Sequence, residues 1–259
     1  MDLWDLIRIP LEYLMDFIYN IVKNYGLAII LFTIVVKLIL LPLNIKSQKA
    51  MRKQQKIQPI LAELQKKYAN DKEKLQTEMM KLYKENDVSM FGGCLPMLIQ
   101  FPILIGLYRV IQSYLNRPAG EVNFNFLGLD MSKVPSQAIG LITKGDFSDI
   151  GVVTLIIIPI LAMLTTWISM KQSQKMAGQN NSQAGEQAAQ MSGTMNAIMP
   201  VMTGFFAITL PSGMGLYWIV SNLVQMVQQY ALNKFFDSKG DDFVVKVPEK
   251  KRKNSKKRR

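Results

Sequence analysis

The chain has 259 residues, of which 49% are hydrophobic, and a formal net charge of +12. One cysteine and no histidine exclude an intramolecular disulfide framework, ordinary zinc sites and catalysis by Ser-His or Cys-His pairs. The sequence also lacks a Gly-rich phosphate loop and an acidic metal cluster, so we predict a protein that is not an enzyme and needs no cofactor or metal.

The first 24 residues predict an amphipathic helix. Apolar residues recur at helical spacing, namely Leu3, Ile7, Leu11, Leu14, Ile18 and Ile21. Because Asp2 and Asp5 come first and no small-residue cleavage site follows, this segment does not read as a secretory signal. We expect a retained helix that lies in the outer interface of a membrane, with an uncleaved membrane anchor as the alternative.

Residues 26–43 form an apolar stretch long enough for a membrane-spanning helix, and it contains one charge, Lys37. A charge in such a place is costly and usually functional. Thr33 lies one turn earlier on the same face and Asn44 about two turns later, so this polar stripe should face protein or trapped water. The alternative is a lysine whose ammonium group snorkels to the headgroups, since Lys37 is roughly two turns from the end of the segment.

Residues 44–90 predict a helical hairpin with a turn at Asn70 and Asp71. Its two apolar stripes are Ile57, Ile60, Leu61, Leu64 and Tyr68 on one helix and Leu75, Met79 and Leu82 on the other. Four lysines at helical spacing form one basic face near the membrane: Lys46, Lys49, Lys53 and Lys56. Such a face is either a solvated surface that also touches anionic lipid or a docking site for an acidic or nucleic-acid-bearing partner.

Four further apolar blocks follow, at residues 91–115, 150–170, 195–210 and 213–236. With residues 26–43 they predict five spans in one compact domain, residues 25–236, with a loop at 116–149. Polar residues recur within them: Gln100, Thr165 and Ser169, and, in the last span, Trp218, Ser221 or Asn222, Gln225, and Gln228 or Gln229. Each of these could simply bond a neighbouring helix, at about 0.6 kcal/mol. Together with Lys37 they suggest a shared polar cavity open toward the cytoplasm.

The placement of basic residues predicts the topology. Residues 44–90 carry eleven Lys or Arg, whereas the 116–149 loop carries three against four acids. The positive-inside bias therefore places the hairpin and the C-terminus in the cytoplasm and the N-terminus outside. Residues 237–259 should be a disordered basic tail that attracts ribosomal RNA or anionic lipid. Its predicted contact residues are Lys250, Lys251, Arg252, Lys256, Lys257, Arg258 and Arg259.

Over roughly residues 26–233 the chain resembles the YidC/Oxa family of membrane protein insertases. Four segments carry the resemblance: TIVVKLILLPLNIKSQKAM (33–51), GGCLPMLIQFPILIGLYRVI (92–111), MNAIMPVMTGFF (195–206) and PSGMGLYWIVSNLVQMVQQY (211–230). The resemblance is to a bacterial, short form without a large outer domain. It implies an all-α integral membrane protein whose five transmembrane helices surround a hydrophilic groove open to the cytoplasm, beside the hairpin and the N-terminal helix.

The resemblance also implies a function in the bacterial cell membrane. The family's groove carries an arginine where this chain has Lys37, which keeps the charge but lacks the bidentate fork. Its groove residues here, expected to contact substrate, would be Lys37, Thr33, Gln100, Trp218, Ser221 and Gln225. Such a protein receives newly made membrane proteins and releases them into lipid, alone or with the Sec translocon. The hairpin and the tail would recruit substrate or the ribosome, and one copy could suffice.

Two other functions fit a basic membrane protein with polar residues in its spans. A small transporter or channel would more often show paired acids or an internal inverted repeat, and the sequence has neither. A membrane anchor that tethers ribosomes through its tail would explain the charge but not the aligned polar residues. It would also be indifferent to substitution of Lys37.

Overall fold

The computed structural model describes residues 3–89, 95–145, 151, 155–176, 186–239 and 245. Helices dominate the described part, as expected. Its strands are β1 (Asn125–Phe126) and β2 (Leu129–Asp130), which pair antiparallel. In chain order the described helices are α1 (Leu3–Val22), α2 (Tyr25–Ile39), α3 (Leu41–Lys67), α4 (Lys72–Glu85), α5 (Leu95–Leu115), α6 (Ser136–Thr143), α8 (Ile157–Met176), α9 (Glu186–Thr209) and α10 (Ser212–Lys239).

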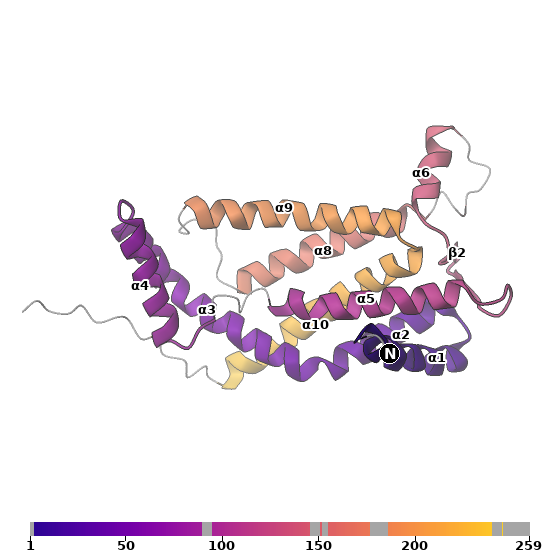
Figure 1. Ribbon diagram of the computed structural model, residues 1–259, viewed down its shortest axis with the longest axis horizontal. Helices are drawn as coiled ribbons and strands as arrows, with labels where there is room; N and C mark the ends of the chain where they lie inside the picture. Colours follow the sequence, from indigo (N-terminus) through magenta and orange to yellow (C-terminus); the bar gives the residue numbers. More distant parts are fainter. Residues whose placement is uncertain are drawn as a thin grey trace, which may run out of the picture.

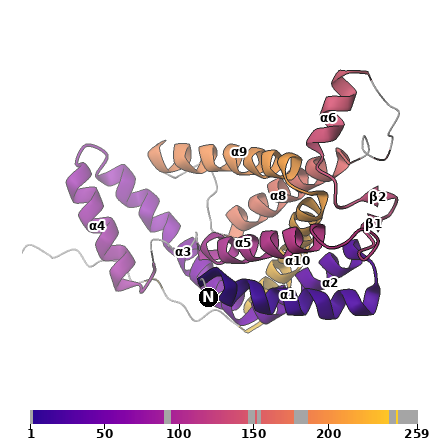
Figure 2. The same cartoon turned by 45° about the vertical axis from the view of Figure 1, so that its right-hand side comes forward.

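The long helices run side by side in an elongated bundle (Figure 1). The closest packing joins α8 to α9 and α10, α10 to α2, and α1 to both α2 and α5. The α3–α4 hairpin leaves one end of this bundle, and the β1–β2 pair and α6 lie at the other end (Figures 1 and 2). The bundle therefore has two different ends, which we call the hairpin end and the strand end.

By length and hydropathy, no single helix in the described ranges is sufficient to cross a bilayer. The helices α2 and α3 meet that requirement only together, and they are bent by 62° where they join. The number of spans, their topology and the predicted domain boundaries therefore stay predictions.

The break between α2 and α3 is the main departure from the expected continuous helix over residues 26–43. Helix α2 ends at Ile39, Leu40 lies between the two helices, and Pro42 lies in the first turn of α3. Proline has no backbone N–H to donate to the carbonyl of Leu38, and its ring disfavours helical geometry at the residue before it. The apolar composition predicted a span, but this proline makes the chain turn.

The strand end is closed by packed aromatic rings and backbone hydrogen bonds. The ring of Tyr25 lies 4.9 Å from that of Phe124 and 5.6 Å from that of Tyr114, measured between centroids. The backbone N–H of Tyr25 donates to the Asn123 carbonyl (3.0 Å), and that of Gly213 to the Met131 carbonyl (3.1 Å). The sequence predicted only a loop over residues 116–149. That segment instead forms β1, β2 and α6 and closes this end of the bundle.

The predicted hairpin is confirmed, including its turn. Helix α3 ends at Lys67 and α4 begins at Lys72, and the Asp71 side chain caps α4 by accepting from the Lys74 backbone N–H (3.1 Å). Ile57, Leu61 and Leu82 are buried between the two helices. The hairpin therefore has a small apolar core of its own, separate from that of the bundle.

Gly213 lets α10 begin close against α2, and a larger residue there should destabilise the bundle. A Cβ at this position would lie 3.0 Å from Ile29 Cδ1 and 3.0 Å from Tyr25 Cε1. We expect Gly213→Leu to lower the free energy of unfolding by about 1–3 kcal/mol through overpacking, measured by thermal unfolding in detergent. Gly140→Leu is the matched control, because a Cβ there meets nothing within 4 Å. Equal stability of the two variants would contradict this packing.

Candidate functional site

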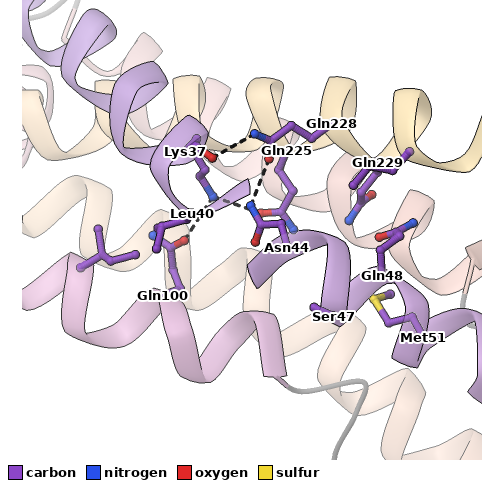
Figure 3. Close-up of a pocket in the computed structure, with 12 residues that line it drawn as sticks. Lys37, Leu40, Asn44, Ser47, Gln48, Met51, Gln100, Gln225, Gln228 and Gln229 are labelled. Atoms are coloured by element: carbon purple, nitrogen blue, oxygen red, sulfur yellow. Dashed lines mark hydrogen bonds between the residues drawn. The ribbon is translucent and has the colours of Figure 1, made fainter. Parts of the chain in front are cut away.

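A polar pocket lies at the hairpin end, where α2 breaks and continues as α3. It contains about 530 Å³ of space not filled by atoms, part of it open to solvent. Side chains of α2, α3, α5 and α10 line it (Figure 3). The lining residues are Lys37, Leu40, Asn44, Ser47, Gln48, Met51, Gln100, Ile103, Gln225, Gln228, Gln229 and Leu232.

Lys37 is the charged residue of this pocket, and only 7% of its surface is exposed. Its Nζ donates to Gln100 Oε1 of α5 (3.3 Å) and to Gln225 Oε1 of α10 (3.4 Å). Gln100 in turn donates through Nε2 to the hydroxyl of Tyr217. The ammonium group therefore points to two neighbouring helices rather than along its own helix toward a headgroup region, which argues against the snorkelling interpretation.

Within the part of the chain that the structure describes, the lining residues include no aspartate or glutamate. Amide oxygens orient their dipoles toward the ammonium group of Lys37, but they do not neutralise it. A buried charge without a counter-ion costs several kcal/mol unless polar groups or water solvate it. The pocket thus presents a positive charge that can still accept an anionic partner.

The helix break adds a second set of hydrogen bonds around Lys37. The last carbonyls of a helix have no N–H partner within it, and the Lys37 carbonyl accepts from Gln228 Nε2 (3.2 Å). Gln228 Oε1 accepts from Asn44 Nδ2 (3.2 Å), which lies just beyond the break in α3. Gln228 therefore joins the end of α2, the start of α3 and α10.

On the part of α3 that follows the break, hydrogen bonds and an ion pair hold α3 against α10 along the wall of the pocket. Gln48 Nε2 donates to Asn233 Oδ1 (3.1 Å). Arg52 donates through Nη2 to the Asn233 carbonyl (2.8 Å) and forms an ion pair with Asp237 (2.8 Å). The guanidinium of Arg52 also lies 5.0 Å from the ring centroid of Phe236, within cation–π range. These contacts fix the relative position of the two walls.

Two polar atoms beside the pocket, Ser47 Oγ and Gln229 Oε1, are buried and have no hydrogen-bond partner among the described residues. Buried polar atoms in proteins are nearly always bonded to protein or to ordered water. Both residues line the pocket, so water or a polar ligand there would satisfy them. Among the described residues, no group of three His, Cys, Asp or Glu side chains could hold a metal ion.

The predicted groove residues divide into two sets. The structure brings Lys37, Gln100 and Gln225 into direct contact. Thr33, Ser221 and Trp218 are not among the lining residues. Contact with a substrate stays a prediction for all six.

Each residue of the second set has another environment. Thr33 is fully buried and donates its hydroxyl to the Ile29 carbonyl of its own helix (2.7 Å). Ser221 is buried on α10. Trp218 stacks on Phe206 of α9, with ring centroids 6.4 Å apart. All three residues lie on α2 or α10, which contribute to the wall of the pocket, but none of them is a lining residue.

The sequence analysis did not select Ser47 and Gln48 as site residues, because everything after residue 43 was assigned to the hairpin. A signal was present: positions 37, 44, 47, 48 and 51 continue one helical face across the break. Those on α3 all line the pocket, together with Lys37. A stripe followed past the end of the apolar block would have found them.

Of the four lysines in the predicted basic face of α3, Lys46 and Lys49 are exposed, whereas Lys53 and Lys56 are half-buried. The Lys49 ammonium lies 5.8 Å from the ring centroid of Phe236. The seven predicted contact residues of the tail, between 250 and 259, lie outside the described residues. Binding of ribosome or lipid by either group stays a prediction.

Hydrogen bonds between polar side chains of neighbouring helices join α8 to α10. Asn222 Nδ2 donates to Thr166 Oγ1 (2.9 Å), and Gln229 Nε2 donates to Ser173 Oγ (2.8 Å). For Asn222 the bonding of a neighbouring helix is therefore a sufficient explanation. The stripe of α10 thus has two functions, with Gln225 and Gln228 turned to Lys37 and Asn222 turned to α8.

Comparisons with known proteins agree on one family. Residues 17–239 match the family model described as "60Kd inner membrane protein". The chain is 42% identical over 236 residues to the membrane protein insertase YidC of Clostridium perfringens, covering 91% of this chain and 84% of that protein. It is 37% identical over 225 residues to the YidC of Caldanaerobacter subterraneus subsp. tengcongensis, covering 86% of this chain and 92% of the relative.

A solved structure is also similar to this fold. It is a crystal structure of an active YidC insertase with the first transmembrane domain resolved, and the TM-score is 0.61 at 27% sequence identity. The match covers 89% of this chain but only 47% of the solved one, so the chain spans about half of that protein.

Removal of the Gln228 side-chain amide should destabilise the break between α2 and α3. Gln228→Leu leaves both the Lys37 carbonyl and the Asn44 amide without their partner in two half-buried hydrogen bonds, at about 0.5–1.5 kcal/mol for each hydrogen bond lost. We expect a lower thermal unfolding temperature in detergent. Val227→Leu is the control, because Val227 is 68% exposed, and a Gln228→Leu protein as stable as this control would contradict the bonding described.

Proposed function

The chain belongs to the 60Kd inner membrane protein family, and we propose that it acts as a membrane protein insertase, as its relatives are named. Members of this family are bacterial membrane proteins and not classical enzymes. The substrates are newly made membrane proteins. Insertion places the substrate in lipid without changing it chemically. Insertion therefore needs a path for polar segments rather than a catalytic centre.

One observation carries this proposal: a buried lysine solvated by neutral amides, in a pocket open at one end of a bundle whose other end is closed. A polar segment that crosses a bilayer must pass about 30 Å of hydrocarbon. The twelve residue steps from Tyr25 to Lys37 span about 18 Å of helix. A wet pocket that reaches Lys37 would shorten the dry part of the path to roughly that length.

Lys37 attracts acidic residues of the translocating segment. No carboxylate among the described residues that line the pocket competes for its ammonium group, so an incoming Asp or Glu would be its first counter-ion. The contact need not be strong, because the pocket is partly open to solvent and water can replace the carboxylate. Transient binding suits a protein that must release its substrate.

Lateral release of the substrate is driven by the transfer of its apolar side chains into the lipid. Each apolar side chain that moves from the pocket into hydrocarbon gains roughly 0.8 kcal/mol per CH₂ group. Together with the membrane potential, this transfer drives the step without a nucleotide. In our proposal the hairpin end faces the cytoplasm, as the positive-inside bias predicts, and the strand end faces outward.

The basic residues near the hairpin end recruit the substrate while it is still being made. Lys46 and Lys49 are exposed on α3, and the tail adds eight basic residues in its last ten. Both would bind ribosomal RNA through its phosphates. A single copy could perform these steps, alone or beside the Sec translocon.

The charge of Lys37 can be tested by substitution. Lys37→Leu should reduce insertion roughly 5- to 30-fold, the equivalent of 1–2 kcal/mol, whereas Lys37→Arg should preserve it because arginine keeps the positive charge. The measurement is protease protection of the acidic N-terminal tail of a short single-span protein, in liposomes that contain only this chain. Equal protection by the wild type and both variants would show that the charge is dispensable.

The tail can be tested by deletion. Removal of residues 248–259 should weaken co-sedimentation with ribosomes roughly tenfold or more at low salt and flatten its salt dependence, because fewer phosphates are neutralised. Insertion without ribosomes should be unchanged. A full-length control exchanges Lys for Arg, and Arg for Lys, throughout the tail and should bind like the wild type. Unchanged binding after deletion would place the ribosome contact elsewhere, with the hairpin as the next candidate.

A further inference from the structure

The N-terminal helix α1 lies beside α5 and runs in the same direction (Figure 2). Its contacts advance along both helices together. Leu11 lies next to Gly106, where a Cβ would meet its Cδ1 at 2.7 Å. Further along both helices, Glu12 Oε1 accepts from Ser113 Oγ (2.6 Å), and one turn later Asp16 pairs with Arg117 (2.5 Å). The two helices therefore run in the same direction and are in contact from Leu11 to Asp16.

The side of α1 that faces away from the bundle is apolar. Leu6 is 71% exposed, Tyr13 73%, Phe17 66% and Ile21 67%. Steps of seven, four and four residues place these side chains on one helical face. The opposite side contributes Met15 to the core of the bundle. A stripe of large apolar side chains along a whole helix is unfavourable in water and fits the acyl chains of a bilayer.

The charges of α1 are turned from this stripe and are bonded. Arg8 pairs with Glu12 (2.5 Å) and Asp5 (3.4 Å). Asp16 accepts from the hydroxyl of Tyr114 (2.6 Å) in addition to its ion pair with Arg117. Charges are costly in hydrocarbon, and paired charges that face other helices are the form in which they occur there. Composition alone therefore underestimates how well this helix suits lipid.

We infer that α1 is embedded in the bilayer beside α5, with the stripe of Leu6, Tyr13, Phe17 and Ile21 in contact with lipid acyl chains. A helix lying flat in the outer interface would cross a membrane-spanning α5 at a steep angle and touch it at one place, whereas α1 contacts α5 at successive points from Leu11 to Asp16. The start of α1 then lies deep in the membrane and its end lies near the outer headgroups. This inference concerns the architecture of the membrane domain and does not depend on the proposed insertase activity.

The depth of the stripe tests this inference directly. Leu6→Cys, Tyr13→Cys, Phe17→Cys and Ile21→Cys are made one at a time in a Cys94→Ala chain and spin-labelled. The full chain is then placed in phosphatidylcholine and phosphatidylglycerol vesicles. Depth follows from the relative accessibility of each label to oxygen and to a water-soluble nickel chelate. The fifteen residue steps from Leu6 to Ile21 span about 22 Å of helix, so we expect depth to decrease steadily from position 6 to position 21.

Four labels at one depth would overturn the inference and support a flat interfacial helix, and four labels in water would overturn it as well. A label on Lys81 of the hairpin, whose side chain is 55% exposed, gives the reference value for water. All four positions lie on the exposed face, so a single label should not disturb the core, and any three of them still define the gradient.

Discussion

An ammonium group buried between helices has to be solvated, and in this bundle the hydrogen bonds that solvate Lys37 link α2 to α5 and α10. Its Nζ is within 3.3 Å of Gln100 Oε1 on α5 and 3.4 Å of Gln225 Oε1 on α10. Two neutral amides stabilise the charge but do not cancel it, whereas a carboxylate would cancel it. The protein therefore keeps a positive charge inside the membrane domain that a passing acidic residue can use.

The two ends of the bundle are built for opposite tasks. At the strand end, aromatic rings and backbone hydrogen bonds close the space between helices. At the hairpin end, Pro42 interrupts the helix, and α3 is bent by 62° relative to α2. The pocket lies at this bend. Gln228 bonds across the break, so the interruption costs less than an unsatisfied helix end would. In our proposal, this difference between the two ends lets the pocket carry a polar segment part of the way across a bilayer.

Sequence patterns identified much of this arrangement, because they report which faces of a helix are apolar. The all-α class, the hairpin and its turn at Asp71 were predicted, and so was the cluster of Lys37, Gln100 and Gln225. The pattern could not tell which polar residues are satisfied locally: Thr33 bonds its own helix and Trp218 packs on α9. Ser47 and Gln48 were missed because the polar face of Lys37 and Asn44 was not followed past the end of the apolar block, although it continues across Pro42. The direction of α1 depends on contacts with residues about one hundred positions away, which no local pattern contains.

The most direct test of this account asks whether an inserting chain enters the pocket. A photo-crosslinking amino acid is placed at Gln225, inside the pocket, and in a second protein at Tyr230, which is 69% exposed on the same helix. Ribosomes that carry a stalled single-span substrate with an acidic tail are then bound to membranes containing each protein and irradiated. The account predicts that the acidic tail crosslinks from position 225 and not from position 230. Crosslinks of the tail from position 230 alone would contradict it, because the polar segment would then bypass Lys37.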